Sequence, residues 1–245
     1  MINRRFACGL IGKRFPINNQ KQSQLFYSVT SASGSKINSY FELFPKNFPN
    51  QGPPGDSFLI NDKTLRREFR GLQSENHPDV LIGSSLLNNN STTTATNDNE
   101  DFSSIINKAY TILRNPYNRI AHFIKVYHPQ KLDITQDEVS KQLISDFNSS
   151  SPQSSQDYKD MLMTVLDAHE SLEMATNEQD LQDLTLENNE RINQSEEILD
   201  NLIQSEWPIH DWNPILMESI KLKYWVNIQN GIKDWEPGKP VHLTH

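Results

Sequence analysis

Apolar residues in this chain recur every three or four positions, and this spacing restricts the possible folds more than any other feature. Between residues 62 and 74, for example, Leu65, Phe69 and Leu72 fall on one side of a helix. The period-two alternation rich in Val, Ile and Thr that is typical of strands is missing from the sequence. The sequence therefore predicts an all-α protein.

Prolines and polar stretches divide the chain into separate helices. Asn115-Pro116 interrupts one apolar pattern, and Pro45 and Pro129 follow two others. The stretches 88–100 and 148–156 contain almost no apolar groups, so we expect loops there. The predicted helices cover residues 39–44, 62–74, 101–114, 117–128, 155–175, 177–204 and 213–235.

The charge and the cysteine content exclude several classes of partner. The formal net charge is -8 at pH 7, so the chain as a whole repels nucleic acids and anionic lipids, and we expect neither as a partner. No stretch approaches the roughly 20 apolar residues of a membrane-spanning helix. With Cys8 as the lone cysteine, no zinc site can form on cysteine pairs. The histidines show no metal-ligand spacing, and we expect no metal and no cofactor.

The N-terminal segment differs from the rest of the chain. It is rich in Arg and Lys, carries apolar residues between them, and contains no acidic residue before Glu42. This pattern is typical of an amphipathic mitochondrial transit peptide, which we expect at 1–37. A basic tail without structure is the alternative.

The most concentrated basic segment lies on the predicted helix 62–74 and ends in a rigid turn. Pro78 fixes its own φ and pushes His77 toward an extended conformation, so the chain leaves the helix sharply and directs His77 and Asp79 outward. Both side chains can then hydrogen-bond to another protein, and the basic face attracts an acidic surface. The basic residues off the apolar stripe are Lys63, Arg66, Arg67 and Arg70.

The turn allows two other interpretations. It can be an ordinary helix end followed by an exposed turn. It can also be catalytic, with His77 as general base and Asp79 orienting it, but residues two apart across a proline do not easily hydrogen-bond to each other. No nucleophile or glycine-rich phosphate loop accompanies them. We therefore expect that the protein is not an enzyme.

The motifs in combination resemble a known family. The basic helix, the sequence NHPD and the following NKAYTIL resemble the J-domain of DnaJ-type co-chaperones. The flanking SYFELFPKNFPN and LKYWVNIQNGIKDWEPGKP resemble the HscB family, specifically its mitochondrial members in iron-sulfur cluster biogenesis. The resemblance covers roughly residues 38–245, and the insert at 83–100 departs from it.

The resemblance implies an N-terminal J-domain helical hairpin plus a C-terminal three-helix bundle. We expect the J-domain at 38–130, a linker at 131–156 and the bundle at 157–245. The bundle would bind an IscU-type iron-sulfur scaffold protein. The J-domain would stimulate ATP hydrolysis by a DnaK-type heat-shock chaperone of the mitochondrial matrix and so promote cluster transfer. The zinc-binding cysteine cluster of some animal relatives is not expected here.

The helix 155–175 carries more apolar residues than one buried stripe needs. At about 100° per residue, Met161, Val165, Ala168 and Leu172 lie on one stripe, whereas Leu162 and Leu166 form a second row. The second row is either a binding surface or part of a wider buried stripe. Resemblance of MLMTVLDAHES to the family's contact segment implies scaffold contacts at Met161, Leu162, Leu166, Asp167 and Glu170.

Three further residues bear on this expected interface, two by differing from the family and one by its position on the helix. Thr164 and Ser171 stand where the family has a basic and an acidic residue. Tyr224 corresponds to an aromatic contact of the family, although its helical angle places it beside the core positions Leu216 and Ile220. A tyrosine at the edge of a bundle can serve both roles.

Two functions from different classes remain open at this point. One is the co-chaperone, and the other is an adaptor that binds the scaffold without stimulating an ATPase. An acidic run on the helix 177–204 is either a solvated face or a surface that attracts a basic partner. Its members are Glu178, Asp180, Asp183, Glu187 and Glu190.

Overall fold

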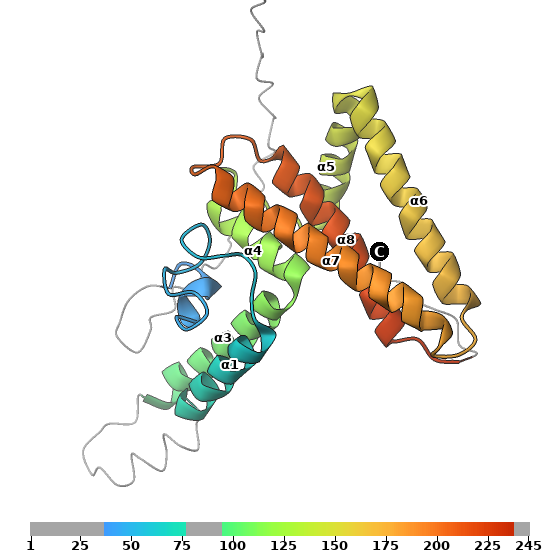
Figure 1. Cartoon of the computed structure of the whole chain (residues 1–245). Coiled ribbons are helices and arrows are strands. Elements are labelled where there is room, and N and C mark those ends of the chain that lie inside the picture. Colours follow the sequence, from blue (N-terminus) through green and yellow to red (C-terminus); the bar gives the residue numbers. More distant parts are fainter. Residues whose placement is uncertain (1–36, 77–94, 238–245) are drawn as a thin grey trace, which may run out of the picture.

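The computed structural model describes residues 37–76 and 95–237, and from 95 to 101 it describes the backbone alone. Within these residues all regular elements are helices (Figure 1), which confirms the predicted all-α class. They are the 3-10 helix η1 (Tyr40–Leu43) and the α-helices α1 (Asp62–Asn76), α3 (Ala95–Arg114), α4 (Pro116–Tyr127), α5 (Asp137–Ser150), α6 (Pro152–Met174), α7 (Asp180–Ser205) and α8 (Asn213–Lys233).

Helices α1 and α3 form the predicted N-terminal hairpin, lying side by side in Figure 1. The Asn61 side chain caps α1 by accepting hydrogen bonds from the backbone N–H groups of Lys63 and Thr64 at 3.0 and 3.2 Å. Leu65 is fully buried, and the Phe69 ring stacks on Tyr110 of α3 with 4.0 Å between centroids. The apolar stripe of α1 therefore faces α3, as its spacing predicts.

The loop between η1 and α1 is held by a buried carboxylate. Glu68 of α1 accepts hydrogen bonds from the backbone N–H groups of Lys46 and Asn47, and from the Asn47 side chain. Several phenylalanines of η1 and of this loop are buried from water, and the burial of each side chain contributes about 1.5–3 kcal/mol to folding. These are Phe41, Phe44, Phe48 and Phe58.

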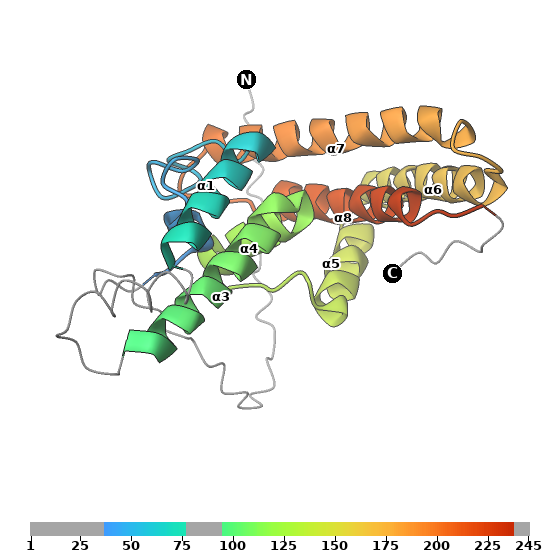
Figure 2. The ribbon, with the colours of Figure 1, turned by 90° about the horizontal axis from the view of Figure 1, so that it is seen from below.

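The C-terminal part contains the predicted three-helix bundle and one helix more. Helices α7 and α8 run side by side (Figures 1 and 2), and α6 packs against both. The additional helix α5 packs on α6 and touches α8. It occupies most of the segment 131–156 that was expected to be a linker.

The predicted loop at 148–156 is wrong for a reason that concerns helix starts. Helix α5 continues to Ser150 and α6 begins at Pro152, with Ser151 as the only residue between them. The Ser151 side chain accepts a hydrogen bond from the Ser154 N–H at 3.0 Å, and proline is well tolerated in a first helical turn. Serine and proline thus begin a helix here.

The predicted loop at 88–100 is corrected in its second half. Helix α3 starts at Ala95, so residues 95–100 are helical. Residues 88–94 lie outside the described residues.

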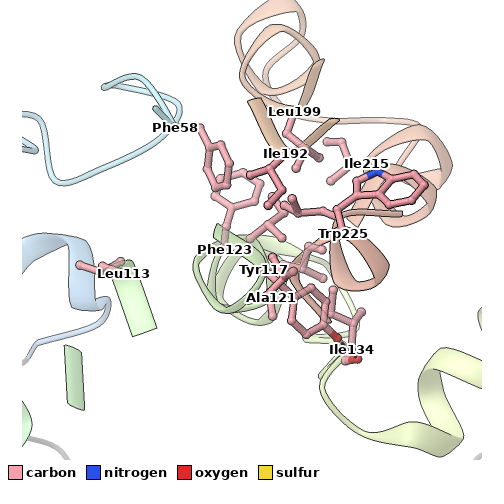
Figure 3. Close-up of a cluster of buried hydrophobic side chains, with 14 of the residues drawn as sticks. Phe58, Leu113, Tyr117, Ala121, Phe123, Ile134, Ile192, Leu199, Ile215 and Trp225 are labelled. Atoms are coloured by element: carbon pink, nitrogen blue, oxygen red, sulfur yellow. Dashed lines mark hydrogen bonds between the residues drawn. The ribbon is translucent and has the colours of Figure 1, made fainter. Parts of the chain in front are cut away.

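The N-terminal part, made of η1, α1, α3 and α4, and the C-terminal part, made of α5 to α8, share one apolar core (Figure 3). Tyr117, Ala121 and Phe123 of α4 face the bundle, where Ile192 and Leu199 of α7 and Ile215 and Trp225 of α8 meet them. The Tyr117 hydroxyl donates to the Ile134 carbonyl oxygen at 2.7 Å, and burial raises the pKa of Tyr117 to about 12. Because α4 packs on α8, the expected separate domains form a continuous body.

A buried ion pair crosses the same junction. The Arg119 side chain on α4 is 1% exposed and donates to the Glu196 carboxylate on α7 and, at 2.7 Å, to the Leu113 carbonyl oxygen. Burial lowers the pKa of Arg119 and raises that of Glu196, and the attraction within the pair opposes both shifts. Removal of one partner would leave the other charge unpaired, at a cost of about 3–5 kcal/mol.

His122 of α4 holds η1 in place as a neutral group. Its Nε2 atom accepts a hydrogen bond from the Tyr40 N–H at 3.0 Å and lies 3.1 Å from the Ser39 hydroxyl. A backbone N–H can only donate, so Nε2 is unprotonated. Burial, with a smaller contribution from the nearby Lys125 charge, lowers the pKa of His122 to about 4.

This shift predicts a loss of stability in mild acid. In the unfolded chain His122 binds a proton at about pH 6.5, whereas in the folded chain it does so only near pH 4. The free energy of unfolding should therefore decrease by about 3 kcal/mol from this residue as the pH falls through that window. The decrease is measured by urea unfolding of the native chain and of His122→Asn at pH 7, 6, 5 and 4. Parallel pH curves for the two proteins would contradict the assignment.

Candidate functional site

One face of α1 is cationic and open to solvent. At about 100° per residue, Lys63, Arg67 and Arg70 lie roughly 140–160° from the buried Leu65 and Arg66 lies about 100° from it. All four side chains are exposed. None of the four forms an ion pair with another described residue. Exposed cationic side chains attract acidic surfaces, and we name this group the basic face.

The structure does not test the predicted docking turn that follows α1. His77, Pro78 and Asp79 lie outside the described residues. Helix α1 ends at Asn76, whose side chain donates to the Leu72 carbonyl oxygen at 2.7 Å. The basic face therefore leads directly into the predicted docking turn.

The predicted scaffold residues of α6 separate into a buried set and an outward set. Met161 lies in the core together with Val165, Ala168 and Leu172, as the stripe predicts. Leu162 is half-buried, and Leu166 is 59% exposed. Asp167 and Glu170 are exposed. Leu166 therefore lies outside the buried stripe, whereas Leu162 packs partly against the core.

A further apolar residue of this surface was missed from the sequence. Met163 is 59% exposed, as much as Leu166. On the helix it lies about 60° beyond Leu166, on the side of Glu170. The sequence contained a signal for Met163, because a methionine opposite the core stripe is as unusual as the leucines beside that stripe. We name Leu162, Met163, Leu166, Asp167 and Glu170 the α6 face.

Tyr224 of α8 lies at the edge of the bundle. It is half-buried, and its hydroxyl oxygen lies 3.2 Å from that of Tyr158 on α6. Burial and this hydrogen bond raise the pKa of Tyr158. The contact ties α8 to α6 near the start of the outward row, so Tyr224 supports the helix that carries the α6 face.

The acidic run on α7 is partly structural. Asp180 accepts hydrogen bonds from the backbone N–H groups of Thr176 and Asn177 and from both side chains, and these bonds lower its pKa. It thereby holds the turn between α6 and α7. Helix α7 begins at Asp180 and not at the predicted Asn177. Asp183, Glu187 and Glu190 are exposed.

The described residues were also compared with the requirements of a metal site and of a membrane-spanning helix. Among them, no three His, Cys, Asp or Glu side chains are grouped so that they could hold a metal ion. No helix in this part of the chain combines the length and apolar character required to cross a membrane.

Comparison with known proteins agrees with this arrangement. Residues 157–233 match the family model described as the HSCB C-terminal oligomerisation domain. The chain is 30% identical over 207 residues to the mitochondrial J-type co-chaperone JAC1 of Saccharomyces cerevisiae, covering 84% of this chain and 94% of the relative.

Solved structures show the same fold. The Jac1 co-chaperone of Saccharomyces cerevisiae superposes with a TM-score of 0.55 at 28% identity, covering 83% of this chain and 99% of that chain. A 5-182 clone of the same protein gives a TM-score of 0.54 at 28% identity, covering 84% and 98%.

A basic helical hairpin joined to a bundle with an outward apolar row, in a chain with these relatives, defines a J-type co-chaperone. The chain belongs to the HscB/Jac-type family, the J-type co-chaperones of iron-sulfur cluster biogenesis. The resemblance inferred from the sequence is thereby confirmed. The relative is mitochondrial, which agrees with the expected mitochondrial location.

The two sets of α6 residues should differ in their effect on folding. Met161→Ala should reduce the free energy of unfolding by about 2–4 kcal/mol, because the substitution leaves a cavity in the core. Leu166→Ala should change it by less than about 0.5 kcal/mol, since that side chain is already hydrated. Urea unfolding followed by circular dichroism measures both values. Equal losses in the two variants would show that Leu166 is a core residue.

Proposed function

We propose that this protein captures an IscU-type iron-sulfur scaffold and stimulates ATP hydrolysis by a DnaK-type heat-shock chaperone of the mitochondrial matrix. The chaperone binds the basic face of α1 together with His77, Pro78 and Asp79. The scaffold binds the α6 face, with Met161 supporting it from the core and Tyr224 from the edge of the bundle. Capture of the scaffold and stimulation of the ATPase together promote cluster transfer.

The observation that carries this proposal is the separation of two unlike surfaces. The basic face is cationic and bears no exposed apolar row, whereas the α6 face is apolar with an acidic rim. In Figures 1 and 2, α1 and α6 lie at opposite sides of the molecule. Surfaces of different chemistry in different places favour two different partners that can be bound at the same time.

Stimulation of the ATPase should depend on His77. In single-turnover assays of the mitochondrial chaperone, purified residues 38–245 should accelerate ATP hydrolysis, and scaffold should increase the rate further. His77→Gln should abolish both effects, because it removes a docking group from the predicted turn. Scaffold affinity and helix content should be unchanged in this variant. A folded native protein that gives no stimulation would leave the adaptor function.

Scaffold binding should depend on the second apolar row of α6. The double substitution Leu162→Ala and Leu166→Ala should weaken binding by at least about 2 kcal/mol, or roughly 30-fold in Kd, if these residues are hot spots. Leu186→Ala on α7 is the matched control, because Leu186 is 68% exposed but lies on another helix. Isothermal titration calorimetry measures both affinities. Unchanged affinity with intact helicity would end the assignment.

A further inference from the structure

Two tyrosines lie where the core of the bundle meets the α6 face. Tyr158 of α6 and Tyr224 of α8 are both half-buried, and their hydroxyl oxygens are 3.2 Å apart. In the part of the chain that the structure describes, each of these hydroxyls has the other as its hydrogen-bond partner. We name these two residues the tyrosine pair.

Tyr158 begins the outward row of α6. Tyr158, Leu162 and Leu166 follow one another at four-residue spacing, and each step turns about 40° further from the core stripe. The first two side chains are half-buried, whereas Leu166 is 59% exposed. A partner that covers this row from Leu166 toward the core therefore also reaches the tyrosine pair.

Covering a tyrosine removes the water that its hydroxyl otherwise binds. A buried hydroxyl without a partner costs free energy, whereas a hydroxyl that is already paired within the protein loses little. Burial and the hydrogen bond to Tyr224 raise the pKa of Tyr158, which agrees with a phenol that is partly removed from water. The hydrogen bond also restricts both rings, so less side-chain freedom is lost when a partner binds. The tyrosine pair can therefore be covered at little cost.

We propose that Tyr158 is a positioning residue of the scaffold site, whose hydroxyl orients the Tyr224 ring and stays paired with it when the scaffold covers both residues. This inference rests on the proposed function, because the scaffold is the partner that covers the α6 face. Without the Tyr158 hydroxyl, scaffold binding would bury the Tyr224 hydroxyl without a partner.

The experiment measures scaffold binding to the full chain and to four variants by isothermal titration calorimetry. Tyr158→Phe and Tyr224→Phe each remove one hydroxyl, whereas the double variant removes both and leaves neither unpaired. The matched control is Tyr117→Phe on α4, which removes a hydroxyl that donates to the Ile134 carbonyl oxygen at 2.7 Å. That oxygen keeps a donor in the control, because the Ser140 hydroxyl also donates to it at 2.7 Å.

Each single variant of the tyrosine pair should raise the Kd for the scaffold by about fivefold, because binding then buries one unpaired hydroxyl. The double variant should bind within about twofold of the native chain, since replacing both hydrogen-bonded groups by apolar ones is nearly neutral. Tyr117→Phe should bind as the native chain does, even if its melting temperature falls. Circular dichroism should show native helix content in all variants. A purely structural role of Tyr158 would not produce the recovery in the double variant.

Two results would overturn the inference while the native chain binds the scaffold. The first is native affinity in Tyr158→Phe. The second is a double variant that binds no better than the single variants, which would show that the two hydroxyls contact the scaffold separately. A native chain that does not bind the scaffold would instead refute the proposed function, and with it the inference that rests on that function.

Discussion

Arg119 is the residue on which the arrangement of the two parts depends. A guanidinium that is 1% exposed has lost nearly all its water, and this loss is tolerated only because several groups surround it. They come from three other segments of the chain: the Phe58 ring, the Leu113 carbonyl oxygen near the end of α3 and the Glu196 carboxylate of α7. Because these groups come from separate segments, the buried charge of Arg119 ties the segments together at the junction.

Sequence reasoning recovered what depends on local spacing. The stripe of α1, the core set of α6 and the break at Asn115-Pro116 all follow from the helical period or from proline, and all are found in the structure. It failed where composition was used in place of local geometry. The serine-rich stretch around Ser151 has the composition of a loop, but one serine in position to cap a helix outweighs that average.

The ion pair could not have been predicted in the same way. Arg119 and Glu196 are 77 positions apart, and Glu196 stands among polar residues of α7 that face water, such as Gln194 and Glu197. On α7, Glu196 and Asp200 stand four residues apart and have the same appearance as a solvated acidic face. Only the partner distinguishes the two cases, and the partner is set by tertiary packing. The exposed residues of the site were easier to find, because exposure is the complement of the apolar stripe.

The junction also determines how two binding events can be coupled. When one chain binds two partners, the second encounter takes place at an effective concentration set by the length and stiffness of the connection. A flexible 26-residue linker, as the segment 131–156 was expected to be, would permit many relative placements and favour none. In the structure, α4 packs on α8 and α5 packs on α6, so that segment contributes no such freedom. A stiff connection gives a high effective concentration only if its angle matches the two partners, and otherwise gives almost none. For the two partners of the proposed function, the packing of the junction and the exposed contact residues would together determine whether the two affinities act together.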